Sequence, residues 1–165
     1  METKKLNIVL FQPEIPENTG NISRNCVGFN ANLHLIRPYG FIVDQKRVKR
    51  AGLDYWEHLN MFQYDDWNDF ITKNNIQDDS KNIFLITKFA DKKLSLLSEN
   101  DFEDNKNIFF VFGRETKGLP EEITNRYFNQ RIGIEMNDNV RSFNLANCAA
   151  IISYNFHYLT KFKYL

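Results

Sequence analysis

Apolar residues in this chain fall into short runs and into longer stretches with helical spacing, and the two kinds alternate. Runs typical of strands lie at residues 6–11, 33–36, 83–86, 108–112 and 131–136. Helices are expected at 21–30, at 66–75, at 121–127 and from residue 140 to Leu159. Residues 12–20 are expected to form a loop, and 98–107 an exposed acidic connection. This alternation predicts an α/β fold with a mostly parallel sheet flanked by helices.

The run at 108–112 is five consecutive apolar residues, three of them aromatic, which is typical of a strand buried on both faces. Gly113 ends this strand, and Gly118 and Pro120 follow in a polar segment before the next helix. Open α/β sheets bind ligands at such loops, because the backbone can approach a small molecule closely where glycine stands. The alternative is an ordinary strand-to-helix turn.

Three polar loops follow predicted strands, at 12–21, 113–120 and 136–144. In a parallel sheet the carboxyl ends of these strands lie at the same edge, so the three loops are expected to form one site. Arg24 stands about one turn after the first loop, off the apolar side of its helix. It is either a solvated helix arginine or a cation that points toward an anionic substrate.

With 165 residues the chain is long enough for one domain, and its 21 Lys and Arg balance its 21 Asp and Glu. Any nucleic-acid surface must therefore be local. The densest basic cluster is at residues 46–50 and includes Lys46, Arg47 and Arg50, with Tyr55 and Trp56 nearby. It is either a solvated helix face or a contact to an RNA backbone, with the aromatic rings available to stack on bases.

Several chemistries have no motif in this sequence. It contains no P-loop, no G-x-G-x-x-G and no G-x-S-x-G pattern, and its three histidines stand apart from one another, so no metal site is expected. Cys26 and Cys148 are read as reduced, buried thiols. The apolar segment after Lys4 and Lys5 is too short for a signal peptide or a membrane helix, so a cytoplasmic protein is expected.

Three motifs in order resemble those of the SPOUT superfamily of RNA 2′-O-ribose methyltransferases. They are Asn-Thr-Gly-Asn-Ile at 18–22 with Arg24, Phe-Gly-Arg-Glu-Thr-Lys-Gly-Leu-Pro at 112–120, and Ile-Glu-Met at 134–136 followed by Arg-Ser-Phe-Asn-Leu at 141–145. The resemblance covers nearly the whole chain. The start of the chain and the segment 46–55 are similar to the smallest branch, the TrmL/YibK-type enzymes that methylate the wobble cytidine or uridine of tRNA.

The resemblance implies one domain over residues 1–165, a C-terminal trefoil knot, and a homodimer in which the first and last helices pack across the two-fold axis. It also implies that the knot binds S-adenosylmethionine. Matched residue by residue, the cofactor contacts fall at Ile86, Gly113, Ile134, Met136 and Ser142. At Gly113 a side chain is expected to block the adenosine.

The family assigns the arginine that matches Arg24 to the ribose and to catalysis. The family role proposed for it is the base. Because a guanidinium is almost always protonated, the alternative is that Arg24 holds the phosphate or polarises the hydroxyl while another group takes the proton. In either case Arg24 is the expected catalytic residue. The tRNA anticodon loop is the expected partner, and no metal or membrane is expected. The substrate-binding candidates are Asn18, Lys46, Arg47, Arg50, Arg114, Glu115 and Arg141.

Arg114 and Glu135 stand where the family commonly has proline. Arg114 adds a cation near the RNA, whereas Glu135 is expected to place a charge beside the cofactor loop. Two other functions stay open: methylation of ribosomal RNA, and a module that binds RNA or cofactor without turnover.

Overall fold

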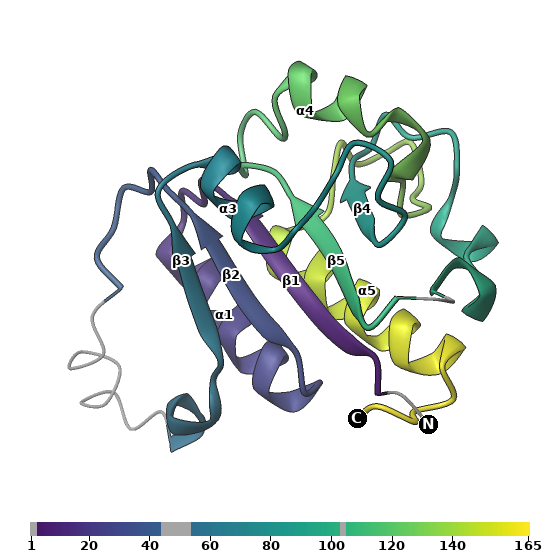
Figure 1. Ribbon diagram of the computed structural model, residues 1–165. Helices are drawn as coiled ribbons and strands as arrows, with labels where there is room; N and C mark the ends of the chain where they lie inside the picture. The colour runs from purple at the N-terminus through teal and green to yellow at the C-terminus, as the bar shows by residue number, and fades with distance from the viewer. Residues whose placement is uncertain (1–2, 44–53, 103–104) are drawn as a thin grey trace.

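The computed structural model describes residues 3–43, 54–102 and 105–165, which form a central sheet with helices on both faces (Figure 1). The sheet has six strands in the order β3-β2-β1-β5-β4-β6, and every pair of neighbouring strands is parallel. This confirms the predicted α/β class. The strands are β1 (Lys5–Phe11), β2 (Asn32–Ile36), β3 (Met61–Tyr64), β4 (Ile83–Ile86), β5 (Asn107–Phe112) and β6 (Arg131–Ile132).

Among the described residues, four α-helices cover the two faces of this sheet. Helices α1 (Pro16–Gly28) and α5 (Leu145–Leu159) pack together on one face, and α3 (Trp67–Lys73) and α4 (Glu121–Arg126) cover the other. Short 3₁₀ helices lie between the longer elements: η1 (Asp54–His58), η2 (Leu94–Leu96), η3 (Glu99–Phe102) and η4 (Phe128–Gln130). No helix in the described ranges combines the length and the hydrophobicity that a membrane crossing requires.

The two central strands are buried on both faces, as their continuous apolar runs predict. On β5, Phe110 and Phe112 face the α1–α5 layer, whereas Phe109 and Val111 face the α3–α4 layer. Successive side chains of a strand point to opposite faces, so one apolar run supplies both cores. The predicted inward face of the helix near residue 70 is also confirmed, because Phe70 is fully buried.

Helix α1 starts five residues earlier than predicted, because residues 16–20 are helical and not part of a loop. Pro16 occupies the first turn, where its missing N–H leaves no hydrogen bond unmade and its fixed φ suits the helix. Asn18 and Thr19 are consequently buried in the first turns of α1.

In the C-terminal third the regular elements are shorter than predicted. Strand β6 has two residues where six were predicted, so residues 133–143 form a long connection, and α5 begins at Leu145 instead of residue 140. Asn144 is the N-cap of α5, and its Oδ1 accepts hydrogen bonds from the backbone N–H groups of Ala146 at 2.9 Å and Asn147 at 3.4 Å.

Two further predictions fail. Strand β3 was missed because it is short and its Phe62 and Gln63 are exposed, so it has no continuous apolar run. The segment predicted as an exposed acidic connection contains η3, where Phe102 is fully buried against Phe84, Phe110 and Phe156. One large ring is enough to anchor that segment to the core.

A largely buried polar cluster, the strand network, joins β1, β2 and β3 through Asn7, Asn32, His34, Tyr64 and Asn74. The His34 ring nitrogens pair with the Tyr64 hydroxyl at 2.7 Å and with Asn7 Oδ1 at 2.9 Å. Asn7 Oδ1 also accepts from Asn32 at 2.9 Å, and the Tyr64 hydroxyl accepts from Asn74 at 3.1 Å. Burial lowers the pKa of His34 to about 3, so this ring is neutral and structural.

Candidate active site

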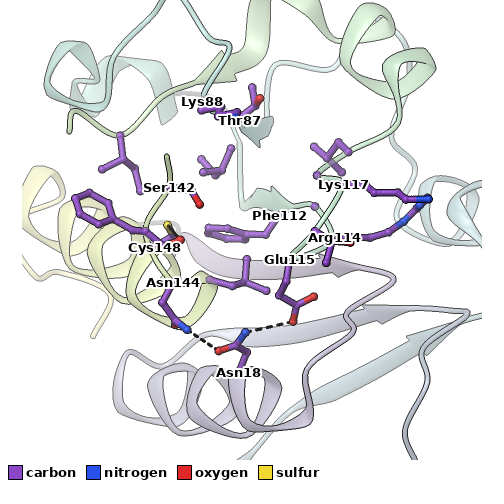
Figure 2. A pocket seen from close by; sticks show the side chains of 18 of the residues that line it. Asn18, Thr87, Lys88, Phe112, Arg114, Glu115, Lys117, Ser142, Asn144 and Cys148 are labelled. Carbon is purple, nitrogen blue, oxygen red and sulfur yellow. Dashed lines mark hydrogen bonds between the residues drawn. The ribbon is translucent and has the colours of Figure 1, made fainter. Parts of the chain in front are cut away.

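The carboxyl ends of the strands surround a cavity of about 540 Å³, a size that suits a small-molecule ligand (Figure 2). The strand order reverses between β1 and β5, and crevices at such switch points are where open α/β sheets bind ligands. The cavity is lined from the start of α1, from the loop after β5, and from the connection between β6 and α5. The three segments predicted to form one site therefore do so.

All five residues expected to contact the cofactor line this cavity: Ile86, Gly113, Ile134, Met136 and Ser142. Three of the expected substrate residues also line it: Asn18, Arg114 and Glu115. Arg24 and Arg141 are exposed and are not among the lining residues. The expected RNA contacts Lys46, Arg47 and Arg50 lie outside the described residues.

The loop after β5 supplies its own reason for glycine at position 113. A Cβ built there lies 2.2 Å from the carbonyl carbon of Gly118 and 2.3 Å from the backbone nitrogen of Leu119. Residues 114 and 118 also exchange backbone hydrogen bonds of 3.2 and 2.9 Å, which folds the loop back on itself. Gly113 is therefore required by its own loop, whether or not a ligand is bound, and Gly118 supports the same turn with φ of +65°.

Side-chain hydrogen bonds join all three motifs, in a cluster that we call the loop network (Glu14, Asn18, Glu115, Thr116 and Asn144). Glu115 accepts from the Asn18 amide at 3.4 Å, and the Asn144 amide donates to Asn18 Oδ1 at 2.9 Å (Figure 2). Because Asn144 also caps α5, this chain of bonds fixes the start of α5 relative to α1 and to the loop after β5.

Each of the two carboxylates of the loop network accepts hydrogen bonds from the backbone of the loop that carries the other carboxylate. Glu115 accepts from the backbone nitrogens of Glu14 at 2.8 Å and Ile15 at 3.0 Å. Glu14 in turn accepts from the backbone nitrogen of Thr116 at 3.0 Å and from its hydroxyl at 2.9 Å. Glu115 therefore holds two loops together as a carboxylate acceptor, which is the structural role that its position in the loop allows.

Arg114 points away from the centre of the cavity (Figure 2). Its guanidinium carbon lies 5.3 Å from the centroid of the Phe11 ring, within cation–π range. Its Nε is buried and has no hydrogen-bond partner among the residues that the structure describes. Arg114 therefore packs the loop after β5 against Phe11 at the end of β1.

Arg24 lies on the exposed side of α1, where its guanidinium carbon is 5.8 Å from the centroid of the Tyr55 ring in η1. The structure therefore brings Arg24 together with one of the two aromatic residues that follow the basic cluster, but not with the cavity of its own chain. Its position off the apolar side of the helix agrees with the sequence pattern.

Ile134 and Met136 line the cavity, whereas Glu135 between them contacts η2. Its side chain is exposed and accepts a hydrogen bond from the backbone nitrogen of Ser95 at 3.1 Å. Hydrogen bonding from Ser95 lowers the pKa of this carboxyl. Glu135 thus ties the connection after β6 to η2, and it is not one of the residues that line the cavity.

Sequence reasoning missed the turn after β4, where Thr87, Lys88 and Phe89 line the cavity. The signal was the position of the turn, since it follows a buried strand at the same edge of the sheet as the three motifs. Cys148 was read as a core thiol but is half-buried and lines the cavity, and burial raises its pKa. Both cysteines are free, as predicted.

The chemistry that this arrangement allows is binding and positioning. The walls supply apolar surface from Ile86, Phe112, Ile134, Leu145 and other residues, and backbone groups come from the surrounding loops. Within the described ranges, no three His, Cys, Asp or Glu side chains come together as a metal ion would need. A ligand with a flat apolar part and polar groups at its edges fits these walls.

Comparison with known proteins gives the family. The model of the SpoU rRNA Methylase family matches residues 5–154. A protein of Geobacillus stearothermophilus named "Putative tRNA (cytidine(34)-2′-O)-methyltransferase" is 49% identical over 150 residues, which are 90% of this chain and 91% of that protein.

Two solved structures share the fold. An RNA methyltransferase described as putative, from Bacillus anthracis, superposes with a TM-score of 0.87 at 42% identity, covering 97% of each chain. A structure from work on 2-OH methylation of C/U34 on tRNA gives a TM-score of 0.80 at 31% identity, covering 97% of this chain and 99% of that one. This chain belongs to the SpoU rRNA methylase family.

Proposed function

We propose that this protein transfers a methyl group from S-adenosylmethionine to the ribose 2′-hydroxyl of the wobble pyrimidine in a tRNA anticodon loop. The observation that carries the proposal is that all five expected cofactor residues meet at one cavity, in a chain whose 49%-identical relative is named for this reaction. We place this activity in the cytoplasm, where tRNA is modified, and in a single domain that comprises residues 1–165.

S-adenosylmethionine is the cofactor expected of the family, and the cavity fits it. Its apolar walls at Ile86, Ile134 and Met136 suit an adenine ring, and the loop around Gly113 brings backbone groups to the rim. The bound cofactor supplies an activated methyl on a sulfonium, with a neutral thioether as leaving group. The work left to the chain is to align the ribose hydroxyl and to accept or stabilise its proton.

Arg24 is the proposed catalytic residue, and its position outside the cavity of its own chain favours a site that a second copy of the chain completes. The outer side of α5 carries exposed apolar residues at helical spacing: Ile151 is 38% exposed, Tyr154 55% and Tyr158 62%. The N-terminal end of α5 lines the cavity at Leu145 and Cys148. We propose a homodimer through α1 and α5, in which Arg24 of the partner subunit completes the site.

Mixed dimers test this assignment. A 1:1 mixture of Arg24→Ala with Gly113→Ala should restore methyl transfer that neither variant has alone, because one site of the mixed dimer combines an intact cavity with an intact arginine. Activity that stays absent from a verified mixed dimer would instead place Arg24 in the site of its own chain.

We also propose that the C-terminal segment forms a trefoil knot. The support is its path: the connection 133–143 leads from the edge strand β6 back to α5, which packs beside α1 near the centre of the sheet. The test is an experimental structure whose termini are extended computationally; a chain that straightens without a knot would end this part of the proposal.

Ribosomal RNA methylation remains the second candidate, favoured by the family's own description as rRNA methylases. The one sequence feature that favours a non-catalytic module is Glu135, and its carboxylate accepts a hydrogen bond from the backbone nitrogen of Ser95 and does not line the cavity. The deciding experiment is methyl transfer from labelled S-adenosylmethionine to unmodified tRNA and to ribosomal RNA, with the products digested and resolved by mass spectrometry. A 2′-O-methylated pyrimidine at tRNA position 34 supports the proposal, and label in ribosomal RNA alone supports the second candidate.

A further inference from the structure

The turn after β4 presents an exposed aromatic ring at the edge of the cavity. Phe89 is one of the lining residues, yet 73% of its surface is exposed to solvent. A single exposed apolar residue needs no explanation by itself, but this one borders the cavity in which the methyl donor is proposed to bind. Phe89 matched no motif, and nothing in the proposed reaction has yet used it.

Loose packing of the turn does not explain this exposure. The backbone nitrogen of Thr87 donates to Ile132 O at 3.0 Å, and that of Phe89 donates to Thr87 Oγ1 at 3.3 Å. Ala90 is buried, and the nitrogen of Leu94 donates to Gly133 O at 2.8 Å. The turn is attached to β6 and its extension on both sides of the ring. The backbone that carries Phe89 is therefore held in place, which reduces the ordering entropy lost when a partner packs on the ring.

One lysine lies beside this ring, and a second lines the same cavity. Lys88 Nζ lies 5.1 Å from the centroid of Phe89, and Lys117 lines the cavity from the loop after β5. Figure 2 shows Lys88 on the side of the cavity opposite Asn18, and Lys117 on a third side. Within the described ranges, neither lysine forms an ion pair with a carboxylate. Unpaired ammonium groups beside an exposed ring match the two parts of a nucleotide, its phosphate and its base.

We propose that Phe89 stacks on the base of the nucleotide to be methylated and that Lys88 binds an adjacent phosphate. The proposal rests on the proposed function. A ribose whose hydroxyl enters the cavity carries its base at the rim, because the base and the 2′-hydroxyl are attached to neighbouring carbons of the sugar. Enzymes that act on one nucleotide take it out of the base stack, and an aromatic side chain then replaces the lost stacking.

The test uses the full-length protein, S-adenosylmethionine, and an anticodon stem-loop RNA that carries a fluorescent cytidine analogue at the wobble position. Phe89→Ala and Phe89→Leu should each weaken RNA binding by about 5- to 100-fold and abolish the fluorescence change on binding, since neither can stack. Phe89→Trp should restore both. Affinity for S-adenosylmethionine should stay within about twofold of wild type. Phe128→Ala is the matched control, because Phe128 is 52% exposed as the first residue of η4 and is not one of the residues that line the cavity.

Lys88→Ala should weaken RNA binding and reduce the dependence of log K on log salt by about one unit, whereas the exposed Lys81 before β4 should be neutral when replaced by alanine. Unchanged RNA affinity in Phe89→Ala would overturn the proposal. So would a parallel loss of S-adenosylmethionine affinity, which would assign Phe89 to the cofactor wall. If the wild-type protein methylates neither the unlabelled stem-loop nor whole tRNA, the proposed function itself fails. This outcome depends on the wild-type protein alone, so it is distinct from a failure of the proposal for Phe89.

Discussion

The strand network and the loop network are both built from hydrogen-bonded polar side chains, but they have different roles. The strand network is buried inside the sheet, with Asn7 1% and His34 3% exposed, and it joins three adjacent strands. The loop network lies at the carboxyl edge and joins segments about 100 residues apart in sequence, such as Asn18 and Glu115. The first network can change only the stability of the sheet. The second sets the relative positions of the loops around the cavity.

Gly113 gives the largest expected effect, because it lies in the loop that carries Glu115 of the loop network. In Gly113→Ala the new Cβ would overlap the backbone of Gly118, so the loop must move. Displacements of about 1 Å near a reacting centre can lower rates by about 100-fold. We expect the rate of methyl transfer to fall by at least that factor. The affinity for S-adenosylmethionine, measured by calorimetry, should fall as well. Gly40→Ala is the control, because nothing lies within 4 Å of a Cβ at that position. Equal cofactor affinities for the two variants would contradict the role given to this loop.

The strand network predicts a large loss of stability without a loss of function per folded molecule. His34→Ala removes a ring that stacks on Phe62 at 5.1 Å and Tyr64 at 5.7 Å, and it leaves Asn7 and Tyr64 without this partner. We expect a decrease of about 3 kcal/mol in the free energy of unfolding, measured in urea. Cofactor affinity of the folded fraction should stay within about twofold. A selective loss of cofactor affinity would show that the two networks are coupled.

Acid should also separate the networks, through His34. Its folded-state pKa of about 3 lies below the usual 6.5, so between these two pH values His34 is protonated in the unfolded chain but neutral in the folded chain. Stability from this group is present above pH 6.5 and is lost as the pH falls toward 3, by up to about 1.4 kcal/mol per pH unit. Between pH 7 and pH 5 we expect a loss of about 2 kcal/mol, with a further contribution from His157, whose pKa burial also lowers. Urea titrations of wild type and His34→Gln at both pH values should show a smaller loss in the variant; equal losses would remove His34 as the cause.

Asn144 belongs to the loop network and also caps α5, and two substitutions separate these roles. Asn144→Ala removes both, so we expect a loss of about 1 kcal/mol of stability and of roughly tenfold in cofactor affinity. Asn144→Asp retains the cap but has no N–H to donate to Asn18, so cofactor affinity should fall while thermal stability is retained. If Asn144→Asp binds S-adenosylmethionine like wild type, the bond to Asn18 does not position the site.

The sequence predicted the fold wherever an apolar run was continuous. The strand at 108–112 and its loop were predicted from their pattern, and the shared edge of a parallel sheet brought the three motifs together as expected. Strand β3 was missed because two of its residues, Phe62 and Gln63, are exposed. The approach of Gly118 to Gly113 could not be predicted, because it is a contact between residues of one loop, which no periodicity encodes.

The parts of the site that the motifs did not contain were the hardest to predict. Thr87, Lys88 and Phe89 were missed because a three-residue turn after a strand is too short to show a recognisable sequence pattern. Arg24 was singled out by its place on a helix, but no pattern in one chain can say that it lies outside the cavity of that chain. Both kinds of information depend on how distant segments are placed, which side-chain spacing does not specify.

Glu135 gives the smallest expected effect and the sharpest contrast with Asn144, because both lie in or next to the connection between β6 and α5. Its exposed carboxylate binds one backbone N–H of η2, so Glu135→Ala should change stability by less than about 0.5 kcal/mol. Cofactor affinity should change by less than about twofold, because the charge does not line the cavity and solvent screens it. Calorimetric titration with S-adenosylmethionine at low and high salt measures this directly. A tenfold gain in affinity that disappears at high salt would show that the carboxylate acts on the cofactor at a distance, and that position in the chain, more than membership of the loop network, decides which residues control binding.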